Sequence, residues 1–448
     1  MKLLKKIFVA FLPPPAIPKL ADSLVAEEYL RYKKRIFIGI FIGYGAAYLI
    51  RKNFSLAMPY LVEQGYTKFQ LGLVLTSLAV AYGISKFVMG VFSDRASAKY
   101  FLATGLSISV MITLVFGFSS RLYHHFNLMV YLMFLHGWAQ GMCHPPCARL
   151  LAHWYSARER GRVMVVNISQ NLAAGLTGIL AVLGRWWFGD WQSLFYLPAI
   201  LAAISIFLVF RLLEDTPQSV GLPPVEKAQG KADTVFEREL SVKEIFFKHV
   251  FNNKAVWLLS FANVFVYFVR CGVLDWAPTY LAEVKGLNYQ EQGVVYFLCE
   301  YAGVVSIILC AYLNNKLFGD KRVLAIIFFM ILVFFFIALY WLNPVGNYLI
   351  DKIALVGIGF SIYAPLVLIG IQTIDLVYKK AVGTATGLTG LFGYLGGTVS
   401  GGAIMGWLVE NHGWNAGFIA LLSSTVLTML IMLPILLTKE KKCQNSIV

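Results

Sequence analysis

Long uninterrupted apolar runs limit this chain to very few folds. Three of them read RIFIGIFIGYGAAYLI, FQLGLVLTSLAVAYGISKFVMGVF and RVLAIIFFMILVFFFIALYWL. Such runs supply the roughly 20 helical residues that cross about 30 Å of hydrocarbon. We count twelve, six on each side of a polar stretch at 214–254. Alternating segments of about ten residues, which membrane barrel strands require, are absent, so helices are the only spanning structure that the sequence allows.

The composition supports a membrane protein. Hydrophobic residues make up 58% of the chain and charged residues 14%, whereas soluble domains have about 45–50% and about 25%. We therefore predict an all-α membrane protein with twelve transmembrane helices in two six-helix bundles. The predicted parts are a cytoplasmic segment 1–35, a first bundle 36–213, a cytoplasmic loop 214–254, a second bundle 255–438 and a cytoplasmic tail 439–448.

Basic residues outside the spans predict the orientation. They precede the first span and recur after every second one, as in Lys33, Lys34 and Arg35, then Arg158, Arg160 and Arg162, and finally Lys439, Lys441 and Lys442. The positive-inside bias then places both termini and the middle loop in the cytoplasm. The net charge of +15 accordingly points to topology and to anionic lipid headgroups, not to nucleic acid.

Charged residues also lie inside the spans. They are the cations Arg51, Lys52, Lys86 and Arg270 and the carboxylates Asp275 and Glu300. Four buried cations would cost roughly 10 kcal/mol in lipid, so we expect them to face a cavity. Four cations against two carboxylates leave two surplus positive charges, which a dianion would cancel. The alternative is a set of static ion pairs with Asp275 and Glu300.

A repeat relates the two halves of the chain. The segments YLIRKNF and YFVRCGV place Arg51 and Arg270 219 residues apart (270 minus 51), close to half the chain length. Two six-span halves with a site at their interface are the arrangement of the major facilitator superfamily. The planar guanidinium fork fits carboxylate or phosphate oxygens, so one arginine from each half would clamp a phosphate.

Several tyrosines inside spans could hydrogen-bond a phosphorylated or hydroxylated ligand. They are Tyr44, Tyr48, Tyr82, Tyr267, Tyr363 and Tyr394. Core packing or an interfacial belt is the alternative for each of them. Tyr267 is the strongest candidate, because it lies about one helical turn before Arg270.

The segments YLIRKNFSLAMPYLVEQGY, GWAQGMCHPPC, DTPQSVGLPP, NVFVYFVRCGVLDWAPTYL and GLFGYLGG resemble the organophosphate:phosphate antiporter family, in particular its bacterial glycerol-3-phosphate branch. The resemblance runs from about residue 30 to the end of the twelfth span. It implies a bacterial inner-membrane transporter that exchanges external organophosphate for cytoplasmic inorganic phosphate, by rocking two helical bundles about a central site.

The resemblance also implies roles for individual residues. The family's phosphate-binding arginines correspond to Arg51 and Arg270, and its acidic pair to Asp275 and Glu300. Its other binding residues correspond to Lys52, Lys86, Asn167, Tyr267, Tyr363 and Tyr394. One position differs, since Gln170 stands where the family has histidine. Glutamine can donate an amide hydrogen to phosphate but cannot become cationic near neutral pH.

Substrate size and alternative functions can be weighed in the same way. Hexose-phosphate transporters of this family carry an acidic residue and a lysine where this chain has Thr386 and Thr389. This favours glycerol-3-phosphate over hexose 6-phosphate. A sugar-phosphate sensor of the same fold stays open. We expect no enzyme, because His136, His144 and His153 are dispersed without a nucleophile at defined spacing.

We expect no metal and no cofactor. The segment CHPPC at 143–147 holds two cysteines and His144, fewer ligands than the four that a structural zinc site takes. We read the two prolines instead as a break in the fourth span. We also expect a monomer that contacts membrane lipids.

Overall fold

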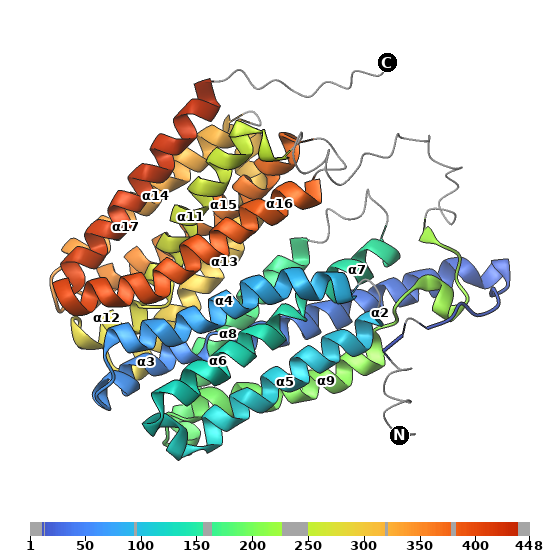
Figure 1. Ribbon diagram of the computed structural model, residues 1–448, viewed down its shortest axis with the longest axis horizontal. Helices are drawn as coiled ribbons and strands as arrows, with labels where there is room; N and C mark the ends of the chain where they lie inside the picture. The colour runs from blue at the N-terminus through green and yellow to red at the C-terminus, as the bar shows by residue number, and fades with distance from the viewer. Residues whose placement is uncertain are drawn as a thin grey trace. The chain divides into compact units, whose positions relative to one another are not determined.

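The computed structural model describes residues 11–12, 14–93, 96–155, 164–225, 250–318, 321–377 and 382–437. Within these residues the chain forms helices and connecting turns and no β-strand (Figure 1). The chain folds into two compact units, one of Met1–Asn53 with Ala81–Glu237 and the other of Phe54–Val80 with Arg238–Val448. Helix α4 (Lys68–Ser93) passes from one unit to the other.

The first unit is built around α2, which packs against α8 and α9 while α5 packs against α9 and α6. Its elements are α2 (Asp22–Leu49), α5 (Ala98–Phe118), η1 (Ser120–His124), α6 (Phe126–Gly141), α7 (His144–Trp154), α8 (Met164–Phe188), α9 (Ser193–Leu212) and η3 (Pro217–Val220). Helix α5 begins where the side chain of Ser97 accepts a hydrogen bond from the Tyr100 amide, the usual use of serine before a helix.

The second unit is built around α11, which packs against α17 and η6, while α15 packs against α13 and α14. Its elements are α3 (Asn53–Glu63), α11 (Lys254–Leu274), α12 (Ala277–Glu283), α13 (Tyr289–Phe318), α14 (Arg322–Leu342), α15 (Tyr348–Asp375), α16 (Val382–Leu391), the π-helical η6 (Phe392–Thr398) and η7 (Ser400–Ile404), and α17 (Met405–Leu437). The Asn253 side chain caps α11 by accepting from the amides of Ala255 and Val256.

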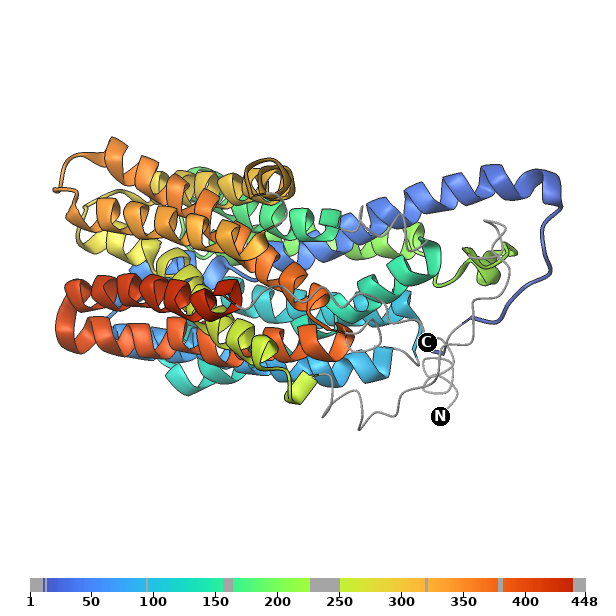
Figure 2. The same ribbon diagram turned by 90° about the horizontal axis from the view of Figure 1, so that it is seen from above.

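Breaks inside several spans explain how these helices correspond to the predicted runs. Eight helices of the described chain are long and apolar enough to cross a membrane, and one of them, Thr384–Leu436, runs through a kink at Gly413. Gly413 has a φ of 77°, and both views show the chain within α17 reversing direction (Figure 2). Helices α2 and α3, and likewise α6 and α7, are halves of interrupted spans. Together with α8, they complete the twelve predicted spans within the described residues.

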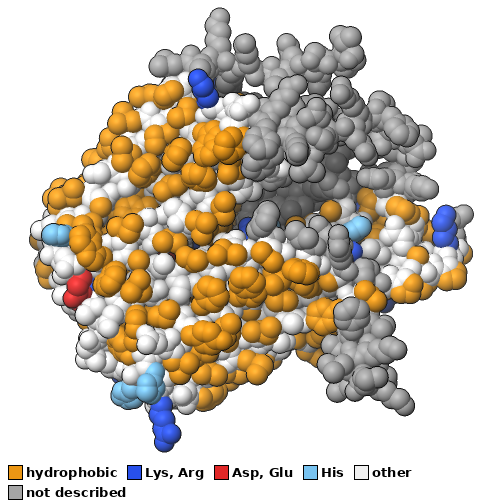
Figure 3. All heavy atoms as spheres, in the orientation of Figure 1, with side chains coloured by type: hydrophobic (Ala, Val, Ile, Leu, Met, Phe, Trp, Pro, Cys, Tyr) orange, Lys and Arg blue, Asp and Glu red, His pale blue; other side chains and the backbone are white. Residues whose placement is uncertain are grey.

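The outer faces of these helices are apolar. On the face shown in Figure 3, hydrophobic side chains are spread over the described surface and charged ones are few. Large hydrophobic side chains such as Met111, Phe118 and Leu342 are exposed. Such a surface suits contact with hydrocarbon, where each helix satisfies its own backbone groups. The all-α membrane fold predicted from the sequence is confirmed, and the chain is a multi-pass membrane protein.

The predicted segment boundaries stay predictions. Residues 1–10, 226–249 and 438–448 include much of the proposed N-terminal segment, most of the middle loop and the whole tail, and they lie outside the described residues. The described part of the N-terminal segment is joined to the first unit, because the Ile17 and Leu20 amides donate to the carbonyls of Gln218 and Gly221 at 3.1 and 2.9 Å.

Candidate functional site

Arg51 and Lys52 lie at a break in the first span. Helix α2 ends at Leu49 and α3 begins at Asn53. Between them the Arg51 amide donates to the Tyr48 carbonyl at 3.1 Å, which closes a tight turn. Interrupted helices are found in membrane transporters where the backbone lines a binding cavity. Both side chains are half-buried.

The guanidinium of Arg51 is held by aromatic rings. Its Cζ lies 3.9 Å from the centre of the Tyr82 ring and 5.1 Å from that of Tyr48. Its Nη1 also donates to the Tyr48 hydroxyl at 3.3 Å. The Lys86 ammonium lies 5.9 Å from the same Tyr82 ring. Arg51 and Lys86, two of the cations predicted to line a cavity, therefore both lie near the Tyr82 ring, whose π face attracts positive charge.

Gln170 belongs to the same group of side chains. The Tyr44 hydroxyl donates to its Oε1 at 3.5 Å, and the ring of Tyr44 meets that of Tyr48 edge-on with 5.4 Å between centres. This contact uses the amide oxygen of Gln170 and not its NH₂ group. Asn167 lies on α8, but its side chain is outside the described residues.

A hydrogen-bonded chain surrounds Arg270 in the second unit. Arg270 Nη2 donates to the Tyr363 hydroxyl at 3.1 Å, and that hydroxyl donates to Glu300 Oε2 at 2.5 Å. Tyr296 donates to the other oxygen, Glu300 Oε1, at 3.4 Å. The chain joins α11, α15 and α13. Within the described residues, Tyr363 therefore links Arg270 to Glu300 in place of the direct ion pair that the alternative interpretation requires.

One donor of Arg270 remains unsatisfied. Its Nε is buried and has no hydrogen-bond partner among the described residues. A buried donor without a partner costs about 1–3 kcal/mol, and more when it carries charge. Such a group needs an explanation in a native structure, and a role in binding an anion is one.

Asp275 has a different setting from Glu300. It follows the last residue of α11, and its Oδ1 accepts from the Ser55 hydroxyl of α3 at 3.1 Å. Both side chains are buried. The acidic pair implied by the resemblance thus has two separate sets of partners, one at the α11–α12 break and one on α13.

Tyr267 and Tyr394 form a pair of rings whose centres lie 5.3 Å apart. Tyr394 belongs to the π-helical η6, and wide π-helical turns occur often at functional sites. A Cβ added at Gly393 would lie 2.8 Å from the Tyr267 ring. Glycine there lets η6 approach α11 closely enough for the two rings to meet.

The two threonines used to judge substrate size differ in exposure. Thr389 is buried, and its carbonyl accepts from Asn263 Nδ2 at 2.9 Å while its hydroxyl accepts from Ser260 at 3.3 Å. These bonds hold α16 against α11, so Thr389 contributes to helix packing. Thr386 is half-buried.

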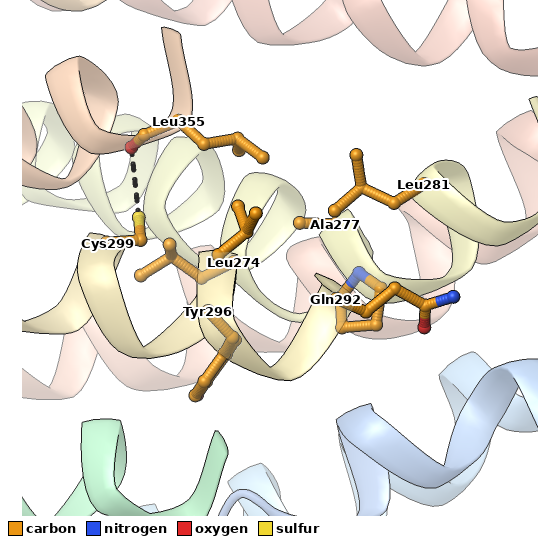
Figure 4. Close-up of a pocket in the computed structure, with 9 residues that line it drawn as sticks. Leu274, Ala277, Leu281, Gln292, Tyr296, Cys299 and Leu355 are labelled. Carbon is orange, nitrogen blue, oxygen red and sulfur yellow. Dashed lines mark hydrogen bonds between the residues drawn. The ribbon is translucent and has the colours of Figure 1, made fainter. Parts of the chain in front are cut away.

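An apolar pocket lies beside this chain of hydrogen bonds but is not the candidate site. Its lining includes Leu274, Leu281, Gln292, Tyr296, Cys299 and Leu355 (Figure 4). The Cys299 thiol donates to the Leu355 carbonyl at 3.0 Å. The pocket contains no cation, so nothing in its lining would neutralise a phosphate. Tyr296, one of its lining residues, donates to Glu300.

The segment CHPPC contributes a helix start. Pro145 and Pro146 occupy the first turn of α7, where the missing proline N–H is not needed. Within the described residues no group of three metal-ligand side chains occurs.

The sequence pattern did not point to the buried residues Ser55, Gln140 and Tyr296, and it indicated His136 only as one of three dispersed histidines. Spacing could have found Tyr296, because it precedes Glu300 by four residues, a same-face separation on a helix.

Comparisons with known proteins identify the family of this chain. The model of the Major Facilitator Superfamily matches residues 40–401. The Glycerol-3-phosphate transporter of Bacillus subtilis is 49% identical over 427 residues, which cover 94% of this chain and 96% of the relative. A membrane sensor protein of Escherichia coli K12 is 33% identical, with 95% of this chain and 98% of the relative covered.

A solved structure shows the same fold. It is that of a bacterial homologue of the human lysosomal transporter Spinster, with a TM-score of 0.69 at 15% identity, covering 90% of this chain and 95% of the other. The resemblance noted in the sequence is confirmed. The chain belongs to the Major Facilitator Superfamily and, within it, to the group of proteins that includes the Bacillus subtilis glycerol-3-phosphate transporter.

Proposed function

We propose that this protein carries a small organophosphate, with glycerol-3-phosphate as the favoured substrate, across the bacterial inner membrane in exchange for inorganic phosphate. The name of the relative with 49% identity supports the substrate class. The fold is that of transporters and not of enzymes. Exchange with inorganic phosphate and alternating access are part of the proposal.

The observation that carries this proposal is the hydrogen bonding of the Arg270 guanidinium. Its guanidinium is oriented by Tyr363 at 3.1 Å, while its buried Nε–H has no partner among the described residues. A phosphate oxygen would accept from that N–H and would be bound by a charge-assisted hydrogen bond. Tyr267 lies one helical turn away and can supply a hydroxyl to the same ligand.

The cations of the first unit support the same ligand class. Arg51 and Lys86 meet one tyrosine ring, and a phosphate bound there would reduce the repulsion between two like charges. We propose Arg51 and Arg270 as phosphate ligands and Lys52, Lys86, Asn167, Gln170, Tyr267, Tyr363 and Tyr394 as supporting ones. Asp275 and Glu300 would balance part of the positive charge.

The remaining features of the proposal concern location. The distribution of lysine and arginine supports cytoplasmic termini and a cytoplasmic middle loop. We propose that the protein acts as a monomer in contact with membrane lipids, without a cofactor.

Proteoliposomes test the exchange. We expect labelled glycerol-3-phosphate to enter vesicles loaded with inorganic phosphate and to enter phosphate-free vesicles at only a small fraction of that rate. Uptake should depend little on membrane potential, since both ligands carry between one and two negative charges near pH 7. Equal uptake in phosphate-free vesicles driven by a proton gradient would indicate symport and would contradict the exchange.

The same vesicles separate the alternatives. Competition by unlabelled glycerol-3-phosphate, 3-phosphoglycerate and glucose 6-phosphate ranks the substrates, and stronger competition by the hexose phosphate would reverse our substrate assignment. A sensor would bind organophosphate without flux. Saturable binding with no uptake in phosphate-loaded vesicles would therefore favour the sensor, a function that the 33%-identical relative bears in its name.

A further inference from the structure

The end of helix α2 leaves backbone carbonyls that need partners. The last four carbonyls of a helix have no partner within it, and in a membrane each unsatisfied group costs several kcal/mol. Here the Ala47 carbonyl accepts from Gln140 Nε2 at 2.9 Å. The Thr177 hydroxyl lies 3.2 Å from the Leu49 carbonyl and 3.2 Å from the Ala173 carbonyl of its own helix, so the two carbonyls share its proton. The carbonyl between those of Ala47 and Leu49, that of Tyr48, accepts from the Arg51 amide.

The geometry determines where the protons of Gln140 lie. A backbone carbonyl can only accept, so the NH₂ group of Gln140 must face Ala47. The same Nε2 lies 3.1 Å from His136 Nε2. Since an amide nitrogen only donates, His136 Nε2 must accept, which makes the imidazole neutral with its proton on Nδ1. Both N–H groups of the amide are then used, one on the backbone of α2 and one on His136.

This arrangement bears on Arg51, because Ala47 lies one helical turn before it. The turn at Ile50–Lys52 starts where α2 stops, and the carbonyls of Ala47 and Leu49 are held there by side chains from α6 and α8. Movement of that helix end would displace the Arg51 guanidinium from its place over Tyr82, 3.9 Å from the ring centre. A phosphate ligand needs its arginine held in this way.

Packing alone would not require these polar residues. Gln140 and His136 are 1% and 3% exposed, and an apolar side chain of similar size would fill either place without a polar group to satisfy. A fully paired polar network in such a place gives orientation more than stability.

We propose that Gln140 and His136 are positioning residues for Arg51, acting through the carbonyl of Ala47. The inference rests on the proposed role of Arg51 in phosphate binding. The hydrogen bonds of Gln140 and His136 lie at the end of α2, and neither residue is itself a proposed phosphate ligand.

The first test replaces Gln140 with leucine. We expect Gln140→Leu to weaken binding of inorganic phosphate about tenfold by calorimetry in detergent, the scale of one lost buried hydrogen bond. Gln292→Leu is the matched control, because Gln292 is 2% exposed and its Nε2 donates to the Leu287 carbonyl at 2.8 Å. The control should lose similar thermal stability but keep parental affinity. Equal affinities in the two variants would overturn the positioning role.

A milder variant covers the case in which Gln140→Leu does not fold. Thr177→Val keeps the shape of the side chain and removes the hydroxyl that the Leu49 and Ala173 carbonyls share. We expect a loss of phosphate affinity of about threefold, in the same direction as for Gln140→Leu. Parental affinity in Thr177→Val would show that the end of α2 does not control the ligand.

His136 is tested by a pair of substitutions. His136→Gln retains an acceptor with similar reach, so it should keep near-parental phosphate affinity. His136→Leu removes the acceptor and should weaken binding about threefold. Equal losses in the two variants would exclude His136 from this role. Nitrogen-15 NMR of labelled histidine gives a ligand-free readout, and a protonated Nε2 on His136 would contradict the assigned hydrogen bonds.

Arg51→Lys separates failure of this inference from failure of the proposed function. If Arg51→Lys binds phosphate with parental affinity, Arg51 is not a ligand and the proposed function loses one of its two arginines. If Arg51→Lys fails to bind while Gln140→Leu binds normally, the role of Arg51 stands and only the positioning role is overturned.

Discussion

The Arg270 guanidinium donates to the hydroxyl of Tyr363 at 3.1 Å and lies with its Cζ 4.9 Å from the centre of the same ring. The hydroxyl has one proton, and it points to Glu300 at 2.5 Å. Tyr363 therefore presents a lone pair to Arg270 and transmits the negative charge of Glu300 to it. Gly303 permits this position, because a Cβ there would clash with the Tyr363 ring.

Removal of the Tyr363 hydroxyl should uncouple Arg270 from Glu300. We expect Tyr363→Phe to weaken phosphate binding about tenfold, because a buried guanidinium N–H and a buried carboxylate oxygen both lose a partner. Calorimetry on the purified variant measures the affinity. Tyr340→Phe is the control, since the buried Tyr340 hydroxyl has no hydrogen-bond partner among the described residues. Its affinity and stability should stay parental or rise slightly. Equal affinities in the two variants would remove Tyr363 from the site.

Arginine at 270 should be irreplaceable by lysine. Lysine keeps the charge but binds phosphate as a point charge without the planar fork. We expect Arg270→Lys to lose at least about tenfold in phosphate affinity and to abolish measurable uptake, while the variant still inserts and stays monodisperse in detergent. Arg185→Lys is the control, because Arg185 is exposed and, among the described residues, donates to the Gly189 carbonyl alone. Near-parental affinity in Arg270→Lys would make Arg270 a structural residue.

Histidine at position 170 should make transport depend on pH. A histidine with a pKa near 6.5 becomes cationic as the pH falls through that value, and it would add positive charge beside the Arg51 group. We expect the ratio of phosphate affinity in Gln170→His to that of the parent to rise as the pH falls from about 7.5 to about 5.5. The ratio cancels the titration of phosphate itself. Gln170→Asn should show a constant ratio. A constant ratio in Gln170→His as well would show that residue 170 does not sense phosphate.

The hydroxyl of Thr76 should stabilise the π-helical segment of the eleventh span. It accepts from the Ala403 amide at 2.9 Å and donates to the Val399 carbonyl at 3.3 Å. Gly72 and Gly402 allow this close approach, because a Cβ on Gly402 would lie 2.7 Å from the Thr76 hydroxyl. Thr76→Val should lower the free energy of unfolding by about 1–3 kcal/mol. Thr76→Ser keeps the hydroxyl and should retain most of the parental stability. Thermal melting in detergent measures both, and identical melting temperatures for valine and serine would refute the role.

Much of the architecture follows from the chain itself. The spans are local, because hydropathy over about 20 residues decides whether a helix enters the membrane. The prediction of a site also came from the sequence, since Arg51 and Arg270 would be costly if they faced lipid. The prolines of CHPPC predicted a break, and α7 begins there.

Which side chains hydrogen-bond to one another was decided only by the tertiary structure. Sequence reasoning allowed direct ion pairs for Arg270, yet its link to Glu300 passes through Tyr363, which is 93 residues from Arg270 and 63 from Glu300 along the chain. Gln140 meets Ala47 across 93 residues, and Asn263 of α11 meets Thr389 of α16 across 126 residues. Hydropathy and helical period determine which residues enter the membrane and which share a face. Contacts between helices depend on their packing and on breaks such as the one after Leu49, which no local pattern encodes.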